Sequence, residues 1–521
     1  MDLTRRTVLG AGASFAAASS FGAFAQEASV VAETSAGPVR GLSSQGVHAF
    51  KGIRYGESTA LSRFAKPIAA AFNSSITDAT AYGAACPQRA DQAVEDEDCL
   101  FLNVWTPALH DGGKRPIMFY IHGGAYSNGS GSDELYDGTH LVNKGDMVVI
   151  TVNHRLNAFG YLYLDRLFPG EFPDSGNAGQ WDLILALNWV KQNAEAFGGD
   201  PDRVMVFGQS GGGAKIATMM ASPAAEGLFH SAATMSGQQV TACGPLNGTA
   251  RAQAFIDNLG LSSTVTPELL RTLPMEQIVE ALNARDPVNP AHGLYFGPVL
   301  DYRMLMRHPF FPDAPSQSAH IPMILGNTKD ETKAFLWRDE AFELTWDTLP
   351  DWLEAQLRCD ILPSHVVTKY REWFPELGPT EIMFKATTAG RSWRGQVEES
   401  DARARQGAPT WVYQFDLPAA DRQRGAPHTI DIEHAFDNLA QSGAMSGTGP
   451  TAARVADQLS TAFINLARNG DPNHAGIPQW DQHTLPDRET MVFDAVTRLE
   501  NDPRRREREL FATVPFIQWG S

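Results

Sequence analysis

The stretch that decides the fold class is VMVFGQSGG, residues 204–212, in which four apolar residues lead into the pattern Gly-x-Ser-x-Gly. Residues 214–220 follow with a composition typical of a helix. A strand, a sharp turn and a helix hold a serine on a strained turn, where glycines are needed because neighbouring side chains would collide. The pattern predicts an α/β fold with Ser210 as a nucleophile and the Gly211 N–H facing negative charge. The alternative, a phosphate-binding or connecting turn, lacks the lysine of a phosphate-binding loop.

A second glycine-rich segment, HGGAY at residues 122–126, directly follows the apolar run 116–121. A tetrahedral oxyanion needs hydrogen-bond donors that converge from more than one segment. We therefore expect residues 122–126 to supply the second half of an anion site beside Ser210.

The rest of the chain predicts one large α/β domain over residues 26–521. Helical spacing occurs at residues 181–197 and 450–467, and no linker, repeat or low-complexity segment interrupts the chain after residue 25. A strand, a helix and a strand across residues 147–207 indicate a parallel pair. Short apolar runs bounded by turn residues predict strands buried on both faces at residues 116–121, 147–152, 204–207, 321–325 and 411–415.

A serine nucleophile needs a histidine base and a carboxylate that orients it, in the chain order serine, acid, histidine for this arrangement. Asp330 and Glu331 both follow the predicted strand 321–325 and both qualify by spacing. His428 follows the predicted strand 411–415, where a base on a loop should emerge. His434 also competes, but it lies in a helical pattern typical of a packed or surface residue. The other competing histidines are His365, His474 and His483.

Two long motifs connect these residues to a known family: EDCLFLNVWTP, residues 97–107, and FGGDP, residues 197–201, ahead of the serine turn. With them the sequence resembles, nearly end to end, the type-B carboxylesterases, which include the cholinesterases and the bacterial para-nitrobenzyl esterases. The resemblance implies an α/β-hydrolase fold, in which helices flank a twisted, mostly parallel sheet and large loop or helical insertions lie over the active site. It selects Glu331 over Asp330 as the acid and supports His428 as the base.

The same resemblance assigns further positions. It implies that the N–H groups of Gly124, Ala125 and Gly211 are the oxyanion donors. It also implies a disulfide between Cys86 and Cys99.

The sequence departs from the family pattern beside the nucleophile. Gln209 stands where Glu is usual, Gly211 where Ala is usual, and Thr332 replaces the usual Gly after the acid. Gln209 takes a negative charge out of the pocket, which makes cationic alcohols such as choline less attractive. Ser236 matches a buried polar position that helps organise the histidine loop, with a plain core serine as the alternative. Asp431 follows the base by three residues, as an acid does in the family.

Composition and charge exclude several classes of partner. The 521 residues carry 42 Lys and Arg against 60 Asp and Glu, a formal charge of −18, so a nucleic-acid backbone would be repelled. The one dense basic run, residues 504–508, predicts a solvated helix. No CxxC motif occurs, and no metal or organic cofactor is expected. The four scattered cysteines, Cys86, Cys99, Cys243 and Cys359, are too few for a disulfide scaffold or a zinc ribbon. Cys243 and Cys359 either pair with each other or stay thiols.

Residues 1–25 predict an export signal. Arg5 and Arg6 precede an apolar, Ala-rich stretch that ends in AFA, a pattern typical of the twin-arginine route. The apolar stretch is shorter than the about 20 residues that a membrane-spanning helix needs, so no stable anchor is expected after cleavage before Gln26. We expect the mature chain to be periplasmic or secreted, where a disulfide can form.

Together these observations predict a serine hydrolase of small-molecule carboxylic esters that works through an acyl-enzyme. The alternatives are an amide hydrolase or acyltransferase with the same residues and a non-catalytic binding protein of the same fold. The sequence leaves monomer and homo-oligomer open. Residues 55–87 and 336–408 are expected to form the pocket walls. The tryptophans of the second range are expected to pack the core of a cap: Trp337, Trp346, Trp352, Trp373 and Trp393.

Overall fold

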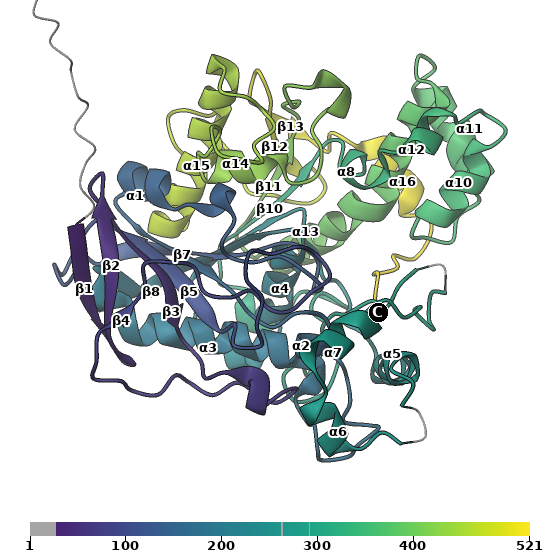
Figure 1. Cartoon of the computed structure of the whole chain (residues 1–521). Coiled ribbons are helices and arrows are strands. Elements are labelled where there is room, and N and C mark those ends of the chain that lie inside the picture. The colour runs from purple at the N-terminus through teal and green to yellow at the C-terminus, as the bar shows by residue number, and fades with distance from the viewer. Residues whose placement is uncertain (1–27, 262–263, 291) are drawn as a thin grey trace, which may run out of the picture.

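The computed structural model describes residues 28–261, 264–290 and 292–521 (Figure 1). The predicted export signal, residues 1–25, and the expected cleavage position before Gln26 lie outside the described residues. None of the helices in the described ranges combines the length and the apolar character that crossing a membrane requires.

One sheet runs through the described part of the chain, in the strand order β1-β2-β3-β5-β7-β6-β8-β9-β10-β11-β12-β13, with β4 paired to β2. Neighbouring strands from β7 to β12 in this order are parallel. The antiparallel pairs are β1–β2, β2–β3, β3–β5 and β5–β7 at one end of the sheet and β12–β13 at the other. The strands are β1 (Ala28–Thr34), β2 (Gly37–Ser44), β3 (Val47–Arg54), β4 (Thr77–Asp78), β5 (Phe101–Thr106), β6 (Arg115–Ile121), β7 (Val148–Val152), β8 (Gly199–Gln209), β9 (Ser231–Met235), β10 (Met323–Thr328), β11 (Thr410–Phe415), β12 (Glu489–Phe493) and β13 (Arg498–Asn501).

The five strands predicted from apolar runs are confirmed as β6, β7, β8, β10 and β11. The pair predicted across residues 147–207 is parallel, but β6 lies between its two members β7 and β8. The central strands are buried on both faces, so Phe119 packs into the core on one face and its neighbour Tyr120 into the core on the other.

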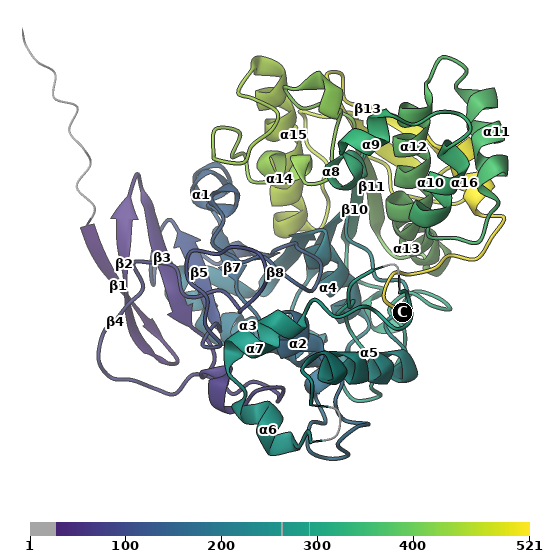
Figure 2. The same cartoon turned by 45° about the vertical axis from the view of Figure 1, so that its right-hand side comes forward.

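Helices cover both faces of the sheet (Figures 1 and 2). On one face α3 and α4 pack against the larger apolar core, and on the other α1 and α15 pack against the second core. The helices are α1 (Thr139–Gly145), α2 (Asn157–Tyr161), α3 (Ala178–Asn193), α4 (Gly211–Met220), α5 (Pro245–Asn258), α6 (Pro267–Thr272), α7 (Met275–Ala281), α8 (Lys333–Leu336), α9 (Asp339–Phe342), α10 (Leu349–Gln356), α11 (Pro363–Trp373), α12 (Pro379–Thr387), α13 (Arg394–Gln406), α14 (Ile430–Ala435), α15 (Pro450–Asn469) and α16 (Arg505–Phe511).

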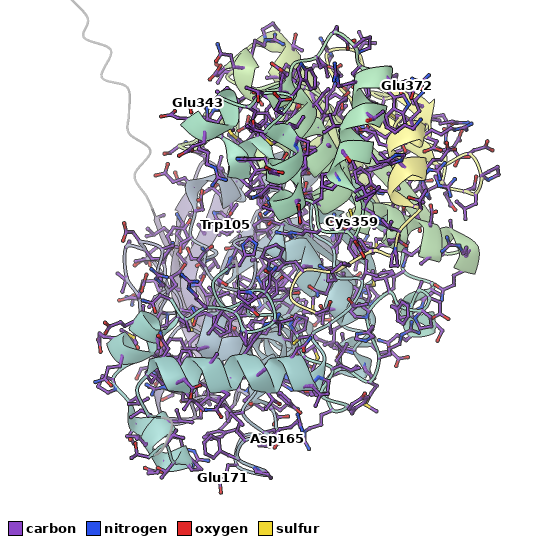
Figure 3. All side chains as sticks on the ribbon, turned by 90° about the vertical axis from the view of Figure 1, so that its right-hand side faces the viewer. Trp105, Asp165, Glu171, Glu343, Cys359 and Glu372 are labelled. Atoms are coloured by element: carbon purple, nitrogen blue, oxygen red, sulfur yellow. The ribbon has the colours of Figure 1, made fainter. Side chains whose placement is uncertain are left out.

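Two helical insertions interrupt the strand succession. Helices α5 to α7 come between β9 and β10, and α8 to α13 come between β10 and β11. Helices α8 to α12, together with α16, form a separate cluster that we call the cap. Figure 3 places Glu343 and Glu372 at the outer end of the cap and Cys359 at its base, near the sheet. The five tryptophans pack in the cap cluster as expected.

The basic run near the C-terminus differs from its prediction. Arg504 caps α16 and residues 505–508 form its first turn, but Arg504 and Glu507 are buried, so the prediction of a solvated helix is wrong for this side of α16. The reason is a buried partner in the cap, because the Tyr370 hydroxyl donates a hydrogen bond to Glu507 Oε1 at 2.9 Å.

The cysteines also differ from their prediction. Cys86 and Cys99 are free, buried thiols, so the predicted disulfide is absent from the structure. The two thiols are neighbours, since a hydrogen bond with Cys86, together with burial, raises the pKa of Cys99 well above its usual range. The Cys86 Sγ also accepts a hydrogen bond from the Leu156 N–H at 3.2 Å. Cys243 and Cys359 are free as well.

Candidate active site

Ser210 occupies the turn between β8 and α4, as the sequence predicts. Its backbone has φ 55° and ψ −124°, a conformation that costs about 1–3 kcal/mol for a residue other than glycine. The surrounding structure holds this conformation, because the Ser210 N–H donates to the Met235 carbonyl at 2.7 Å. The glycine at 212 is required, since a Cβ there would lie 1.9 Å from the Ile121 carbonyl oxygen.

Glu331 and His428 meet in the interior, just beyond the ends of β10 and β11. Nδ1 of His428 hydrogen-bonds to Oε2 of Glu331, and the carboxylate is fully buried. The other carboxylate oxygen, Oε1, accepts hydrogen bonds from Ser236 Oγ at 2.5 Å, the Thr328 N–H at 2.7 Å and Asn327 Nδ2 at 3.1 Å. Burial pushes the pKa of Glu331 upward, but His428 and these hydrogen bonds outweigh it, so the pKa of the carboxyl is lowered overall.

Asp330, the other acid that qualifies by spacing, has a different environment. Its Oδ2 accepts a hydrogen bond from the Ala426 N–H at 3.0 Å, and its Oδ1 lies 3.8 Å from Lys333 Nζ. Asp330 thus fastens the loop that precedes His428, while its neighbour Glu331 contacts the imidazole.

The second imidazole nitrogen of His428 contacts Gln209. Nε2 of Gln209 lies 3.0 Å from Nε2 of His428. A proton on Nδ1, directed at Glu331, leaves Nε2 with the lone pair that accepts from the amide, which is the tautomer of a general base. Among the described residues, Ser210 Oγ makes no hydrogen bond to His428, and the amide of Gln209 is the group that contacts the imidazole Nε2.

The four competing histidines lie elsewhere, and none of them lines the pocket of Ser210. His365 is exposed on α11, and the ring of His474 contacts the Gln458 carbonyl. His483 is buried 3.5 Å from Asp401. His434 is packed inside α14, where burial lowers its pKa to about 4.

The predicted oxyanion donors converge around Ser210. Gly124 and Ala125 follow β6 in left-handed conformations, with φ 85° and 54°. Among the described residues, no group accepts a hydrogen bond from the N–H of Gly124, Ala125 or Gly211, which leaves all three available. Gly211 replaces the alanine usual in the family because a Cβ there would lie 1.9 Å from the Ala125 carbonyl oxygen.

Lys215 is a residue near this site that sequence reasoning missed. Its side chain is fully buried on α4, and its Nζ donates to the Ala125 carbonyl at 2.8 Å, which ties the loop of the oxyanion donors to the nucleophile helix. Burial lowers the pKa of Lys215 to about 7. A lysine at the fifth position after the nucleophile, on a helix expected to be buried, is the sequence signal that could have identified it.

The two remaining predicted positions have separate environments. Ser236 donates its hydroxyl hydrogen bond to Glu331, so it braces the acid and is more than a plain core serine. Asp431 lies on α14 and accepts a hydrogen bond from the Tyr413 hydroxyl at 2.7 Å, and burial raises its pKa to about 7.

The pocket above Ser210, which we call the catalytic pocket, has a volume of about 540 Å³. The cap insertion lines part of it as expected, but residues 55–87 do not, so that half of the predicted wall is wrong. The C-terminal segment takes its place, because a tail after α16 runs back to the pocket. Lining residues that sequence reasoning missed are Tyr295, Arg358, Arg391, Phe516, Gln518 and Trp519. In the described ranges, no group of three or more His, Cys, Asp or Glu side chains could hold a metal ion.

A mostly parallel sheet flanked by helices, with a serine at the strand-to-helix turn and a glycine loop after a neighbouring strand, defines an α/β-hydrolase. The family model described as "Carboxylesterase family" matches residues 28–511, and the chain belongs to this family. The chain is accordingly a carboxylic ester hydrolase.

Relatives agree with this assignment over nearly the whole chain. The para-nitrobenzyl esterase of Bacillus subtilis is 33% identical over 494 residues, which cover 92% of this chain and 98% of that protein. The phenmedipham hydrolase of Pseudarthrobacter oxydans is 31% identical over 89% of this chain and 94% of its own length. The crystal structure of a carboxylesterase from Geobacillus stearothermophilus has a TM-score of 0.82 at 33% identity and covers 92% of this chain and 99% of that one.

Proposed function

We propose that this protein hydrolyses carboxylic esters through an acyl-enzyme formed on Ser210, with His428 as general base and acid and Glu331 as the carboxylate that orients it. The observation that carries the proposal is the hydrogen bond between the buried Glu331 carboxylate and His428 Nδ1, which leaves Nε2 as the basic nitrogen beside the serine turn.

The first half of the reaction forms the acyl-enzyme. Ser210 Oγ attacks the ester carbonyl carbon while His428 Nε2 takes the hydroxyl proton. The oxyanion is held by the N–H groups of Gly124, Ala125 and Gly211. Collapse of the tetrahedral intermediate breaks the bond to the alcohol oxygen, and His428 returns the proton to the leaving alcohol.

The second half releases the acid. Water gives its proton to His428 and attacks the acyl carbon, and Ser210 then leaves with that proton. Before either half can start, His428 Nε2 has to exchange its contact with the Gln209 amide for one with Ser210 or water. Gln209 thus covers the base in the resting enzyme.

The test is the turnover of para-nitrophenyl acetate by Ser210→Ala, with Ser392→Ala as the control because Ser392 lines the same pocket. We expect Ser210→Ala to lose at least about a thousandfold in kcat/KM and the control to stay within about threefold. Wild-type turnover by Ser210→Ala would overturn the proposal. Matched anilides and added alcohol acceptors distinguish an amide hydrolase or acyltransferase that uses the same residues.

We also propose that the chain is exported and then cleaved before Gln26, and that a disulfide oxidant of that compartment takes two electrons and two protons from the neighbouring thiols of Cys86 and Cys99, which leaves a disulfide between them. The paired arginines ahead of an apolar stretch support export, and the contact between the two thiols supports the pairing. Intact mass of the protein from a periplasmic fraction is the measurement. Loss of residues 1–25 and a mass about 2 Da below the fully reduced chain are expected, and a full-length, fully reduced protein in that fraction would contradict both.

A further inference from the structure

The charged side chains that line the catalytic pocket are all positive. Twenty-three residues line it, and they include two arginines, Arg358 and Arg391, but no aspartate or glutamate. This is unusual for a chain with 60 acidic residues and a formal charge of −18. The residue next to the nucleophile, Gln209, is likewise neutral. The catalytic pocket is therefore positively charged although the whole chain is strongly acidic.

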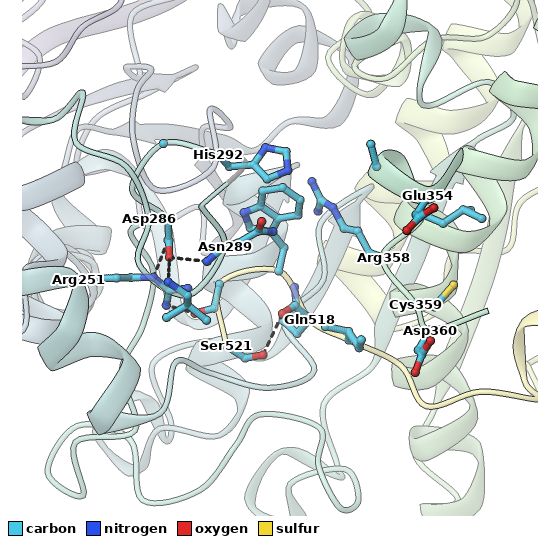
Figure 4. A pocket seen from close by; sticks show the side chains of 17 residues that line it. Arg251, Asp286, Asn289, His292, Glu354, Arg358, Cys359, Asp360, Gln518 and Ser521 are labelled. Atoms are coloured by element: carbon cyan, nitrogen blue, oxygen red, sulfur yellow. Dashed lines mark hydrogen bonds and ion pairs between the residues drawn. The ribbon is translucent and has the colours of Figure 1, made fainter. Parts of the chain in front are cut away.

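Arg358 follows α10 at the base of the cap, and no acidic side chain of the described residues pairs with it. Its guanidinium stacks on Trp519 of the C-terminal tail, 3.6 Å from the ring centroid, and its buried Nε donates to no group among the described residues. Arg358 also lines a neighbouring pocket, drawn in Figure 4, where it reaches towards His292 and the carboxylates Glu354 and Asp360 lie on the other side. Burial and the nearby charge of Arg391 lower the pKa of Arg358, and together they outweigh the opposing effect of the Tyr295 hydroxyl.

Arg391 is placed by an irregular segment. Residues Thr388–Trp393 form a π-helical turn between α12 and α13, a rare geometry that is frequent at functional sites. The Arg391 guanidinium lies 5.3 Å from the centroid of the Phe335 ring, and within the described ranges it hydrogen-bonds only to the neutral Gln356 side chain, at 3.4 Å. Burial lowers the pKa of Arg391 to about 10 without an opposing acid.

Two half-buried guanidinium groups that influence each other and lack counter-ions are a costly arrangement for a folded protein. An arginine presents a planar set of N–H donors that matches a carboxylate, and Arg stays charged over the whole physiological range. A carboxylate placed between Arg358 and Arg391 would satisfy unused donors and relieve their mutual repulsion.

We propose that the catalytic pocket selects esters that carry a free carboxylate, which Arg358 and Arg391 bind while the scissile carbonyl lies at Ser210. This inference rests on the proposed function and names its substrate class. Typical substrates would be half-esters of dicarboxylic acids or esters of hydroxy acids, in which the anionic group is remote from the bond that is cleaved.

The experiment compares kcat/KM for matched anionic and neutral esters. Para-nitrophenyl hydrogen adipate and para-nitrophenyl heptanoate differ in the acyl part, and para-acetoxybenzoate and its methyl ester differ in the alcohol part. We expect one anionic member to be preferred by roughly tenfold or more, and Arg358→Gln and Arg391→Gln to remove about ten- to a hundredfold of its kcat/KM. The neutral member should stay within about threefold, which also reports that each variant is folded, and Arg358→Lys should restore part of the preference.

Arg371→Gln is the matched control. Arg371 is an exposed cap arginine that stacks on Trp346, 4.3 Å from the ring centroid, and it does not line the catalytic pocket. It removes the same charge from the same part of the molecule and should leave both ester pairs unchanged.

Two results would overturn the inference: no preference for either anionic ester, or an equal loss for the anionic and neutral members in the arginine variants. If neutral esters are hydrolysed in a Ser210-dependent manner without an anionic preference, only this inference fails and the proposed function stands. If no ester is hydrolysed, the proposed function fails, and titration calorimetry with adipate against neutral adipamide still decides whether the arginines bind a carboxylate.

Discussion

Gln209 has two effects on the site. Its amide contacts His428, and its side chain leaves the position next to Ser210 without a negative charge. Gln209→Glu places a carboxylate at this point. We expect kcat/KM for acetylthiocholine to rise about tenfold relative to its neutral isostere S-(3,3-dimethylbutyl) thioacetate, because a nearby negative charge favours the cationic leaving group. The ratio of the two rates is the measurement.

The control for this variant is Gln238→Glu, which adds the same charge to the catalytic pocket at a residue that makes no hydrogen bond to His428. An equal rise in both variants would show that the charge of the pocket matters and the contact with His428 does not.

Asp431 predicts a pH dependence of stability. Its pKa rises from an ordinary value of 3.8 to about 7 in the folded protein, because of burial. Between these values the folded protein holds a proton that the unfolded chain has lost, so the free energy of unfolding falls as the pH rises towards 7 and stays lowered above it. Asp431→Asn cannot ionise, and its amide oxygen can still accept from Tyr413.

We therefore compare the free energy of unfolding of Asp431→Asn with that of the wild type at about pH 5 and at about pH 8.5. We expect this difference to shift in favour of the variant by about 1–3 kcal/mol between the two pH values. Urea unfolding of both proteins at the two pH values measures this shift. The same difference at both values would show that Asp431 is not held protonated in the folded state.

For single residues, the sequence predicted the serine turn, the glycine loop and the short list of candidate acids and bases. Spacing alone left Asp330 and Glu331 equivalent, because adjacent residues on a turn point in different directions and only the fold decides which one meets His428. Lys215, Arg358 and Arg391 were missed because no motif contains them, and their importance comes from burial without an acidic partner.

Among the elements, the C-terminal tail was the least predictable from sequence, since residues 512–521 carry no periodic pattern. The tail returns from α16 to the catalytic pocket and is fixed by side chains from other elements. The Val240 N–H donates to Gln518 Oε1 at 2.9 Å, and Arg251 Nη1 donates to the Gly520 carbonyl at 2.6 Å. Strands were predicted well because their apolar runs are buried on both faces, a signal that is local in the sequence.

Deleting residues 516–521 should raise KM for small esters by about tenfold while kcat stays within about threefold, because the tail forms a pocket wall and none of the hydrogen bonds of Glu331 and His428 within the described ranges comes from it. Steady-state kinetics of the shortened chain measures both constants. A fall in kcat with an unchanged KM would mean that the tail positions the reacting groups instead.

For the whole molecule, the parallel sheet explains how residues more than two hundred positions apart come together. Ser210, Glu331 and His428 each follow the carboxyl end of a parallel strand, β8, β10 and β11, and these ends lie at one edge of the sheet. The sheet thus brings together the three groups that we propose as the catalytic residues. The cap insertion and the tail supply the wall, whose arginines give a strongly acidic protein a positively charged pocket.

The central claim is that Ser210 forms the covalent intermediate, and the most direct measurement is the site of reaction with a fluorophosphonate, mapped by tandem mass spectrometry. We predict one adduct per chain on Ser210, absent from Ser210→Ala and retained in Ser392→Ala. An adduct on another residue, or equal labelling of Ser210→Ala, would contradict the account.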